Sequence, residues 1–262
     1  DTIGPVLSLN GAESDTIEVF NPYTDPGFVI VNTCNPVVST QTENNIDTSK
    51  LGGYVITYKA SDAVGNEVAI ERHVTVADQT MPQIALKGND TVLVDVFGTF
   101  NDPGASVSDN YDQNLKAQIS GNVNTSWLGI YPVVYSVTDN SGNGPVDITR
   151  FVKVVDRVAP EISSLSATNG DTLLMDVNTK FNLPGFDISD NYDNDPEVNL
   201  SGSFFDQFPS RKATQTGIFD ADISATDQSG NASHFKVIVK VVDREAPVIE
   251  MKGNLMVGLC RF

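Results

Sequence analysis

The sequence predicts an all-β protein built from β-sandwich domains in tandem. Three short phrases recur in the same order and at nearly the same spacing along the 262 residues. Asp-x-x-x-Pro begins at Asp1, Asp78, Asp156 and Asp243. Pro-Gly begins at Pro26, Pro103 and Pro184, and Asp-x-x-Gly-Asn begins at Asp62, Asp139 and Asp227. Self-similarity at a fixed period indicates copies of one small domain rather than a single large fold.

The repeat spacing predicts the domain boundaries. We expect domains at residues 1–77, 78–155 and 156–242, an insertion at about 203–212 in the third, and an incomplete fourth copy at 243–262. The joints, such as Val155–Pro160, contain proline and no Gly/Ser spacer. Because proline fixes φ and restricts the preceding residue, we expect a semi-rigid rod. The chain opens on a repeat boundary and stops within a repeat, and we interpret it as part of a longer protein.

Each repeat contains a stretch with the period of a half-buried strand. Apolar or aromatic residues occupy alternate positions from Tyr131 to Val137, from Tyr54 to Ala60 and from Phe219 to Ala225. Each stretch follows a glycine turn and ends in Asp-x-x-Gly-Asn, after which a Val-rich segment begins, which predicts a hairpin. No segment shows a convincing helical period. The leading aromatic residue stands where a tyrosine corner would lie, although Phe219 lacks the hydroxyl.

The composition excludes several classes of partner. The chain has 34 acidic and 16 basic residues, for a formal charge of −18, which argues against nucleic acid and anionic lipid surfaces. No apolar run is long enough to cross a membrane. The acidic surface is compatible with bound cations. The two cysteines, Cys34 and Cys260, lie in different repeats, so we favour free thiols over a disulfide to another chain or copy.

The second repeat carries a family likeness. It contains Asn101-Asp-Pro-Gly-Ala105, Ser108-Asp-Asn-Tyr-Asp112 and Thr138-Asp-Asn-Ser-Gly-Asn143, and it ends with Arg150 and a Val-rich strand. This pattern resembles the bacterial immunoglobulin-like surface repeat that is also found in insecticidal crystal proteins and is related to hyalin-repeat modules. The first repeat replaces the acidic segment with Val31–Asn35, and the third has Leu183 before Pro-Gly. The resemblance implies immunoglobulin-like Greek-key sandwiches in secreted or surface-anchored adhesins, stalks and accessory regions of secreted enzymes.

Acidic loops are the candidate metal sites. Ca²⁺ takes six to eight oxygen ligands, and the spacing here differs from that of an EF-hand, so ligands would converge from several loops. The candidates are Asp102, Asp109, Asp112, Asp139 and Asn143 in the second repeat, and Asp190, Asp193, Asp195 and Asp227 in the third. The junction residues Asp78, Asp156 and Asp243 are alternatives in a cadherin-like arrangement. Asp and Asn are also favoured turn residues in their own right, which is the competing interpretation.

Aromatic residues are the candidates for recognition of a partner. These are Trp127 and the phenylalanines of the insertion, Phe204, Phe205 and Phe208, although such residues more often fill a local core. The only histidines, His73 and His234, are far apart in sequence, and no catalytic or phosphate-binding motif is present, so we expect no enzyme.

Two functions compete on this evidence. The first is a structural or adhesive segment of a secreted or cell-surface bacterial protein (adhesin, stalk or filament) that spaces or presents a partner, with Ca²⁺ as a stiffening cation. The second is a carbohydrate-binding accessory region of a secreted hydrolase. The expected partners are other copies of the protein or a surface glycan or protein. The truncated fourth copy could add a strand to the exposed edge of a neighbour.

Overall fold

The computed structural model describes residues 2–32, 36–250 and 252. Cys34 and Cys260 lie outside the described residues, as does most of the proposed fourth copy; residues 243–250 contain no strand. Residues up to Val154 form one compact unit, and residues from Val155 form a second. Nearly all regular structure is β, and among the described residues no helix is long and apolar enough to cross a membrane.

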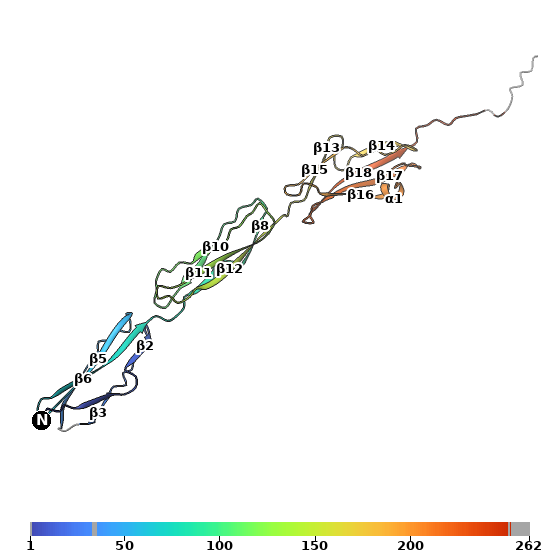
Figure 1. The fold of residues 1–262 in the computed structure, drawn as a ribbon. Helices are drawn as coiled ribbons and strands as arrows, with labels where there is room; N and C mark the ends of the chain where they lie inside the picture. Colours follow the sequence, from blue (N-terminus) through green and yellow to red (C-terminus); the bar gives the residue numbers. More distant parts are fainter. Residues whose placement is uncertain (1, 33–35, 251, 253–262) are drawn as a thin grey trace, which may run out of the picture. The chain divides into compact units, whose positions relative to one another are not determined.

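Each sequence repeat folds into a two-stranded sheet and a four-stranded sheet (Figure 1). In the first repeat the small sheet pairs β1 (Val6–Leu9) with β3 (Phe28–Asn32), and the large sheet has the order β2 (Ser14–Glu18), β6 (Glu67–Ala77), β5 (Gly52–Asp62), β4 (Val37–Glu43). In the second, β7 (Gln83–Leu86) pairs with β9 (Ala105–Ser108), and the order is β8 (Thr91–Asp95), β12 (Val146–Val155), β11 (Gly129–Val137), β10 (Gln118–Ser120). In the third, β13 (Glu161–Ser164) pairs with β15 (Phe186–Ser189), and the order is β14 (Thr172–Asp176), β18 (Ala232–Val242), β17 (Gly217–Thr226), β16 (Glu197–Ser201).

The hairpin predicted at the end of each repeat is present. The strands β5, β11 and β17 are the predicted alternating stretches, and each pairs antiparallel with the strand that follows it. Between them, Asp-x-x-Gly-Asn forms a tight turn in which Asp139 N–H donates to the carbonyl of Asn143 at 3.2 Å. The first strand of the large sheet joins this hairpin in parallel, as β2 does with β6 and β14 with β18. The predicted all-β tandem sandwich class is confirmed.

The alternating positions form the core of each sandwich. Ile56 and Tyr58 in β5, and Val133 and Tyr135 in β11, are buried against residues of the smaller sheet such as Leu9 and Leu86. The tyrosine corner is also present, because the hydroxyl of Tyr131 donates to the carbonyl of Trp127 at 2.9 Å. Tyr54 makes the equivalent bond to Lys50 at 3.1 Å.

A buried arginine joins the two sheets of the second repeat. Arg150 is fully buried in β12, where Nε donates to the hydroxyl of Tyr135 at 3.2 Å. Its Nη atoms donate to the carbonyls of Asn89 at 2.5 Å, Lys87 at 2.8 Å and Gly104 at 3.0 Å. The Tyr135 hydroxyl donates in turn to Asp102. This satisfied network holds the Pro-Gly loop and the β7–β8 loop onto the large sheet.

The first repeat contains the same network, and the third replaces all of it. Arg72, Tyr58 and Asp25 occupy the positions of Arg150, Tyr135 and Asp102 in the first repeat. In the third, the residue opposite Ala221 is Val237, the tyrosine position is Ile223, and Leu183 precedes Pro-Gly. A buried polar network with missing partners is less stable than an apolar core of the same shape. Replacement of all three residues by apolar ones therefore avoids leaving a buried polar group without a partner.

The third repeat also contains a short helix that the sequence did not indicate. α1 (Ser203–Gln207) lies in the insertion and packs against β16 and β17 (Figure 1). It is too short to show a helical period in the sequence. Its position is held by packing, because Phe204 and Phe208 are 0% and 3% exposed.

Candidate metal centres

Three aspartates from separate segments of the second repeat converge. Asp78 opens the repeat, Asp112 lies in the loop after β9, and Asp139 follows β11 in the hairpin turn. One carboxylate oxygen from each lies within 4.8 Å of the others. Two ligands of one Ca²⁺, each about 2.5 Å from the ion, are at most roughly 5 Å apart. The separations therefore fit a shared cation.

Local turns hold each of these side chains in place. Asp139 accepts hydrogen bonds from Asn143, from N–H at 2.7 Å and from Nδ2 at 2.7 Å, and the same Nδ2 donates to the carbonyl of Asp78 at 3.0 Å. Asp112 accepts from Asn140, from N–H at 2.6 Å and from Nδ2 at 2.8 Å. The hairpin turn thus connects the start of the repeat with the acidic loop.

The third repeat forms a similar group. Asp156, Asp190 and Asp227 each offer an oxygen within 4.8 Å of the others. Asn231 bonds both oxygens of Asp227 at 2.8 Å and donates to the carbonyl of Asp156 at 3.2 Å. The third member differs, because Asp190 corresponds to Asp109 of the second repeat rather than to Asp112.

Several buried carboxylate oxygens in and beside these groups lack a hydrogen-bond partner in the part of the chain that the structure describes. Asp78 and Asp156 are 5% and 6% exposed, and Oδ2 of each has no hydrogen-bond partner among the described residues. Oδ2 of Asp109 and Oδ1 of Asp190 are also buried without a hydrogen-bond partner among the described residues. An acceptor buried without a donor is costly, and turn formation does not explain it. The same unsatisfied positions therefore recur in both repeats.

Burial and, to a lesser extent, charge repulsion act on the pKa of Asp78 in the second-repeat group. Burial raises the pKa of Asp78, and the negative charges of Asp109 and Asp139 raise it further, against the N–H of Thr80 and the nearby hydroxyl of Ser141. A carboxylate in this position is stabilised by a proton or by a cation.

The sequence candidates divide between these groups and other roles. Asp109, Asp112, Asp139 and Asn143 lie in or beside the second-repeat group, and Asp190, Asp193 and Asp227 in or beside the third-repeat group. Asp102 instead pairs with Tyr135 and Arg150, and Asp195 donates its N–H to Asp193 at 3.0 Å. Neither belongs to the groups found among the described residues. The junction residues Asp78 and Asp156, named only as alternatives, belong to the two groups and are 5% and 6% exposed. Their recurrence along the sequence was the signal that pointed to them.

The acidic loop also contacts the first repeat within the first compact unit. Glu18, at the end of β2, accepts hydrogen bonds from Gln79 N–H, Thr80 Oγ1 and Asn110 Nδ2, each at 2.8 Å. Burial alone would raise the pKa of Glu18, but these bonds lower it. The rings of Phe20 and Tyr111 lie 5.9 Å apart. The loop that supplies Asp112 therefore also forms the junction.

The aromatic candidates differ in exposure. Trp127 is 64% exposed, as a recognition residue would be. Phe204 and Phe208 are buried in the third-repeat core, where the Phe204 ring lies 4.9 Å from that of Phe181, and Phe205 packs at the edge of the same cluster. These phenylalanines therefore pack as the alternative interpretation expects, in a local core.

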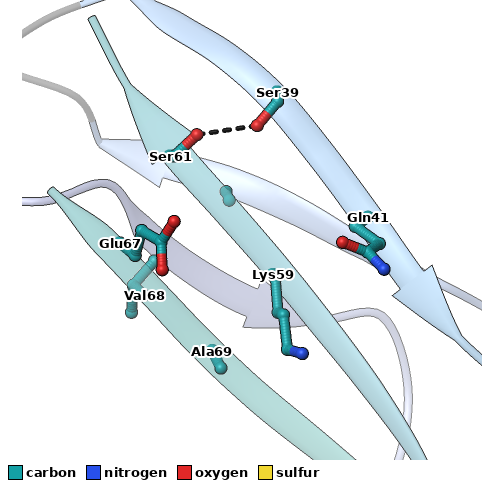
Figure 2. A pocket seen from close by; sticks show the side chains of 8 residues that line it. Ser39, Gln41, Lys59, Ser61, Glu67, Val68 and Ala69 are labelled. Atoms are coloured by element: carbon teal, nitrogen blue, oxygen red, sulfur yellow. Dashed lines mark hydrogen bonds between the residues drawn. The ribbon is translucent and has the colours of Figure 1, made fainter. Parts of the chain in front are cut away.

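A shallow polar groove lies on the first repeat. Figure 2 shows it between β4, β5 and β6, with Lys59 extending between Gln41 and Ala69, and with the Ser39–Ser61 hydrogen bond of 2.7 Å at one end. Its volume is about 260 Å³. Lys59 is already paired with Glu43 at 2.6 Å, and the lining contains no aromatic ring among the described residues. The groove therefore offers little to select a ligand.

The sequence and the fold agree with a known family. The sequence model for "Bacterial surface protein, Ig-like domain" matches residues 7–76 and 84–154, and the chain belongs to this family. The chain is 25% identical over 254 residues to the pesticidal crystal protein Cry22Aa of Bacillus thuringiensis, covering 92% of the chain and 34% of that protein. It is 28% identical over 210 residues to an uncharacterized 81.3 kDa protein of Acholeplasma phage L2, covering 73% of the chain and 26% of that protein. The chain thus spans about a third or less of each relative.

Several solved structures of tandem cadherin domains are similar to this chain. The mouse cadherin-23 EC22-24 fragment has a TM-score of 0.34 at 11% identity, covering 91% of this chain and 99% of that one. The protocadherin gammaB7 EC3-6 structure has a TM-score of 0.32 at 14% identity, covering 94% of this chain and 77% of that one. Scores this low carry no argument about function. The family assignment alone gives a surface-protein segment of immunoglobulin-like type.

Proposed function

We propose that this chain is a structural and adhesive segment that spaces or presents a binding partner at the bacterial surface. Its partners are other copies of the protein or a surface glycan or protein. The support is the recurrence of one sandwich with short proline-containing joints and the absence of a catalytic constellation from the described residues. Immunoglobulin-like surface domains are typically non-catalytic.

The proposal includes Ca²⁺ at the two aspartate groups. Carboxylate and carbonyl oxygens are the ligands that this ion prefers, and the ligands here come from three segments of each repeat. The single observation that carries this step is the unsatisfied buried oxygen of Asp78 and of Asp156. Among residues in or beside the groups, Asp78, Asp112 and Asp139 would hold the ion in the second repeat, and Asp156, Asp190 and Asp227 in the third. A bound cation would neutralise charges that otherwise repel one another.

The stiffening role follows from the shared loop. Asn110 and Tyr111 contact Glu18 and Phe20 of the first repeat, while Asp112, next in sequence, faces Asp78 and Asp139. A cation that fixes the loop would therefore restrict the junction as well. Small-angle X-ray scattering of the full chain, in EDTA and in CaCl₂ at matched ionic strength, should show a narrower distribution of dimensions with Ca²⁺.

Thermal unfolding of an Asp78→Asn variant tests the metal site directly. With Ca²⁺ at about 100 times its Kd, binding contributes about 2.7 kcal/mol, which raises Tm by roughly 10–20 °C for a domain of this size. Because the folded pKa of Asp78 is raised, its contribution to stability is present below the unfolded pKa and lost as pH rises through the folded pKa. At neutral pH, Asp78→Asn should therefore raise Tm in EDTA and remove the Ca²⁺ response of the second repeat.

The matched control removes the same charge elsewhere. Asp90 is exposed and lies outside the aspartate groups, so Asp90→Asn should leave the Ca²⁺ response intact. Wild-type protein whose Tm rises no more in CaCl₂ than in NaCl of equal ionic strength would contradict the metal proposal. The spacer proposal would survive that result.

A second function has one observation in its favour. Trp127 is largely exposed, and an exposed aromatic ring can stack on a sugar, as in a carbohydrate-binding accessory region. Binding to a glycan array that is lost in Trp127→Ala would favour this alternative. Binding that is retained in Trp127→Ala would exclude this residue as the sugar platform.

A further inference from the structure

The second and third repeats leave the large sheet by the same turn. β10 and β16 are each followed by a glycine of positive φ, Gly121 at 109° and Gly202 at 106°. A Cβ at either position would lie 2.3 Å from the carbonyl oxygen of Pro132 or 2.7 Å from that of Asp220. Because each glycine lies against the neighbouring strand, the two chain segments begin at corresponding points.

The two segments also end at equivalent positions, beside the second residue after β8 or β14, but they differ in length. Phe97 N–H donates to the carbonyl of Thr125 at 2.8 Å, and the equivalent Asn178 N–H donates to that of Ala213 at 2.7 Å. The third repeat forms α1 between Gly202 and Ala213, whereas the second runs directly from Gly121 to Thr125. The second repeat therefore lacks the segment that covers this part of the third.

In the third repeat that segment places two phenylalanines on the sandwich. Phe204 lies 4.9 Å from Phe181 and 6.1 Å from Phe219, and Phe208 lies 5.1 Å from Phe219, measured between ring centroids. Both side chains are buried, Phe204 completely. The spacing of four residues aligns them on one side of the helical segment.

In the second repeat the corresponding wall is open. This wall carries a shallow, open hollow of about 480 Å³ lined by Phe100, Ile119, Val123 and Val133, with glycine and threonine residues between them. Phe100 stands where the third repeat has Phe181, and Val123 has the same spacing from its glycine as Phe204. Ile119 is 58% exposed. A cavity of about 150 Å³ accommodates benzene, so this hollow has room for more than one phenyl ring.

We propose that this hollow of the second repeat is a docking site for a partner peptide that presents two phenylalanines one helical turn apart. The occupant is specified by the molecule itself, because the third repeat covers the matching wall with Phe204 and Phe208. Docking of the apolar face of a short helix into a groove is an established mode of peptide recognition. The chain is strongly acidic, with a formal charge of −18, which favours a peptide with basic residues beside the phenylalanines. The site is independent of the aspartate groups and of any bound cation.

A peptide with the sequence of residues 201–213 tests the proposal in trans. Titrated into the full ¹⁵N-labelled chain, it should bind with a Kd of roughly 10 µM to 1 mM and shift the amide signals of Ile119, Val123 and Val133. The same peptide with both phenylalanines replaced by alanine should not bind. Absence of binding by the natural peptide at about 1 mM would overturn the proposal.

Two protein variants distinguish the hollow from a non-specific apolar surface. Val123→Phe fills the hollow as Phe204 does in the third repeat and should weaken binding at least about tenfold. Ile119→Lys provides a second test that spares the core, because Ile119 is already exposed. Leu93→Ala, an exposed apolar residue of β8 outside the lining, is the control and should bind as wild type does. Equal binding by wild type, Val123→Phe and Ile119→Lys would overturn the proposal.

Discussion

At the scale of single residues, the buried arginine is the most informative position. Arg150 lies at an inward position of a Val-rich strand, where the alternation of β12 would place an apolar side chain. The sequence contains the signal, a charge at a core position, but it does not identify the partners. These come from Tyr135 in the adjacent strand and from carbonyls in two loops, and only the folded chain brings them together.

Replacement of this arginine should be far more damaging than replacement of the whole network. Arg150→Met removes the guanidinium that donates to three carbonyls and pairs with Asp102, and it should lower the free energy of unfolding of the second repeat by about 3–5 kcal/mol. The triple variant Asp102→Leu, Tyr135→Ile, Arg150→Val copies the third repeat and should recover most of that loss. Urea unfolding of wild type and both variants measures the difference. If the triple variant were no more stable than Arg150→Met, joint loss of the three residues would not explain why the third repeat lacks the network.

At the scale of elements, strands and turns follow closely from local sequence, whereas α1 does not. The alternation in β11 and the Asp-x-x-Gly-Asn turn are local patterns, so the hairpin could be predicted from them. α1 has only five residues, Ser203 to Gln207, and no side-chain cap, so its formation depends on burial of Phe204 and Phe208 against the sandwich. Aromatic residues in an insertion look the same in sequence whether they face solvent or the core.

Gly202 controls the start of this helix. An L side chain at its φ of 106° is strained, and a Cβ would contact the carbonyl oxygen of Asp220. Gly202→Ala should therefore destabilise the third repeat by about 1–3 kcal/mol. A Cβ at Gly185 would meet no atom within 4 Å, so Gly185→Ala is the matched control and should change stability little. Equal urea midpoints for the two variants would show that the turn does not constrain α1.

At the scale of the whole molecule, the two compact units should respond separately. Chains with several units commonly unfold in more than one transition. The two aspartate groups lie in different units, with Asp78 in the first and Asp156 in the second. In calorimetry with CaCl₂, Asp78→Asn should change one transition and Asp156→Asn another.

Additivity of the Asp78→Asn and Asp156→Asn effects tests whether the two compact units unfold independently. The double variant should show both shifts, since distant sites without shared partners add. A single transition that moves as a whole in either variant would indicate that the two units unfold as one. The division into three domains at residues 77/78 and 155/156 stays a prediction, which excised repeats that fold alone would support.

Local sequence was sufficient for the repeat, the strand hairpins, the tyrosine corner and the all-β class. Each of these depends on residues close together in the chain, where side-chain period and turn chemistry act directly. The folded chain was needed to show which aspartates converge, that Asp102 pairs with Arg150 and Tyr135, and that Phe204 is core while the matching wall of the second repeat is open. These features depend on contacts between segments that are far apart in the chain. Composition and local sequence pattern do not show whether such contacts form.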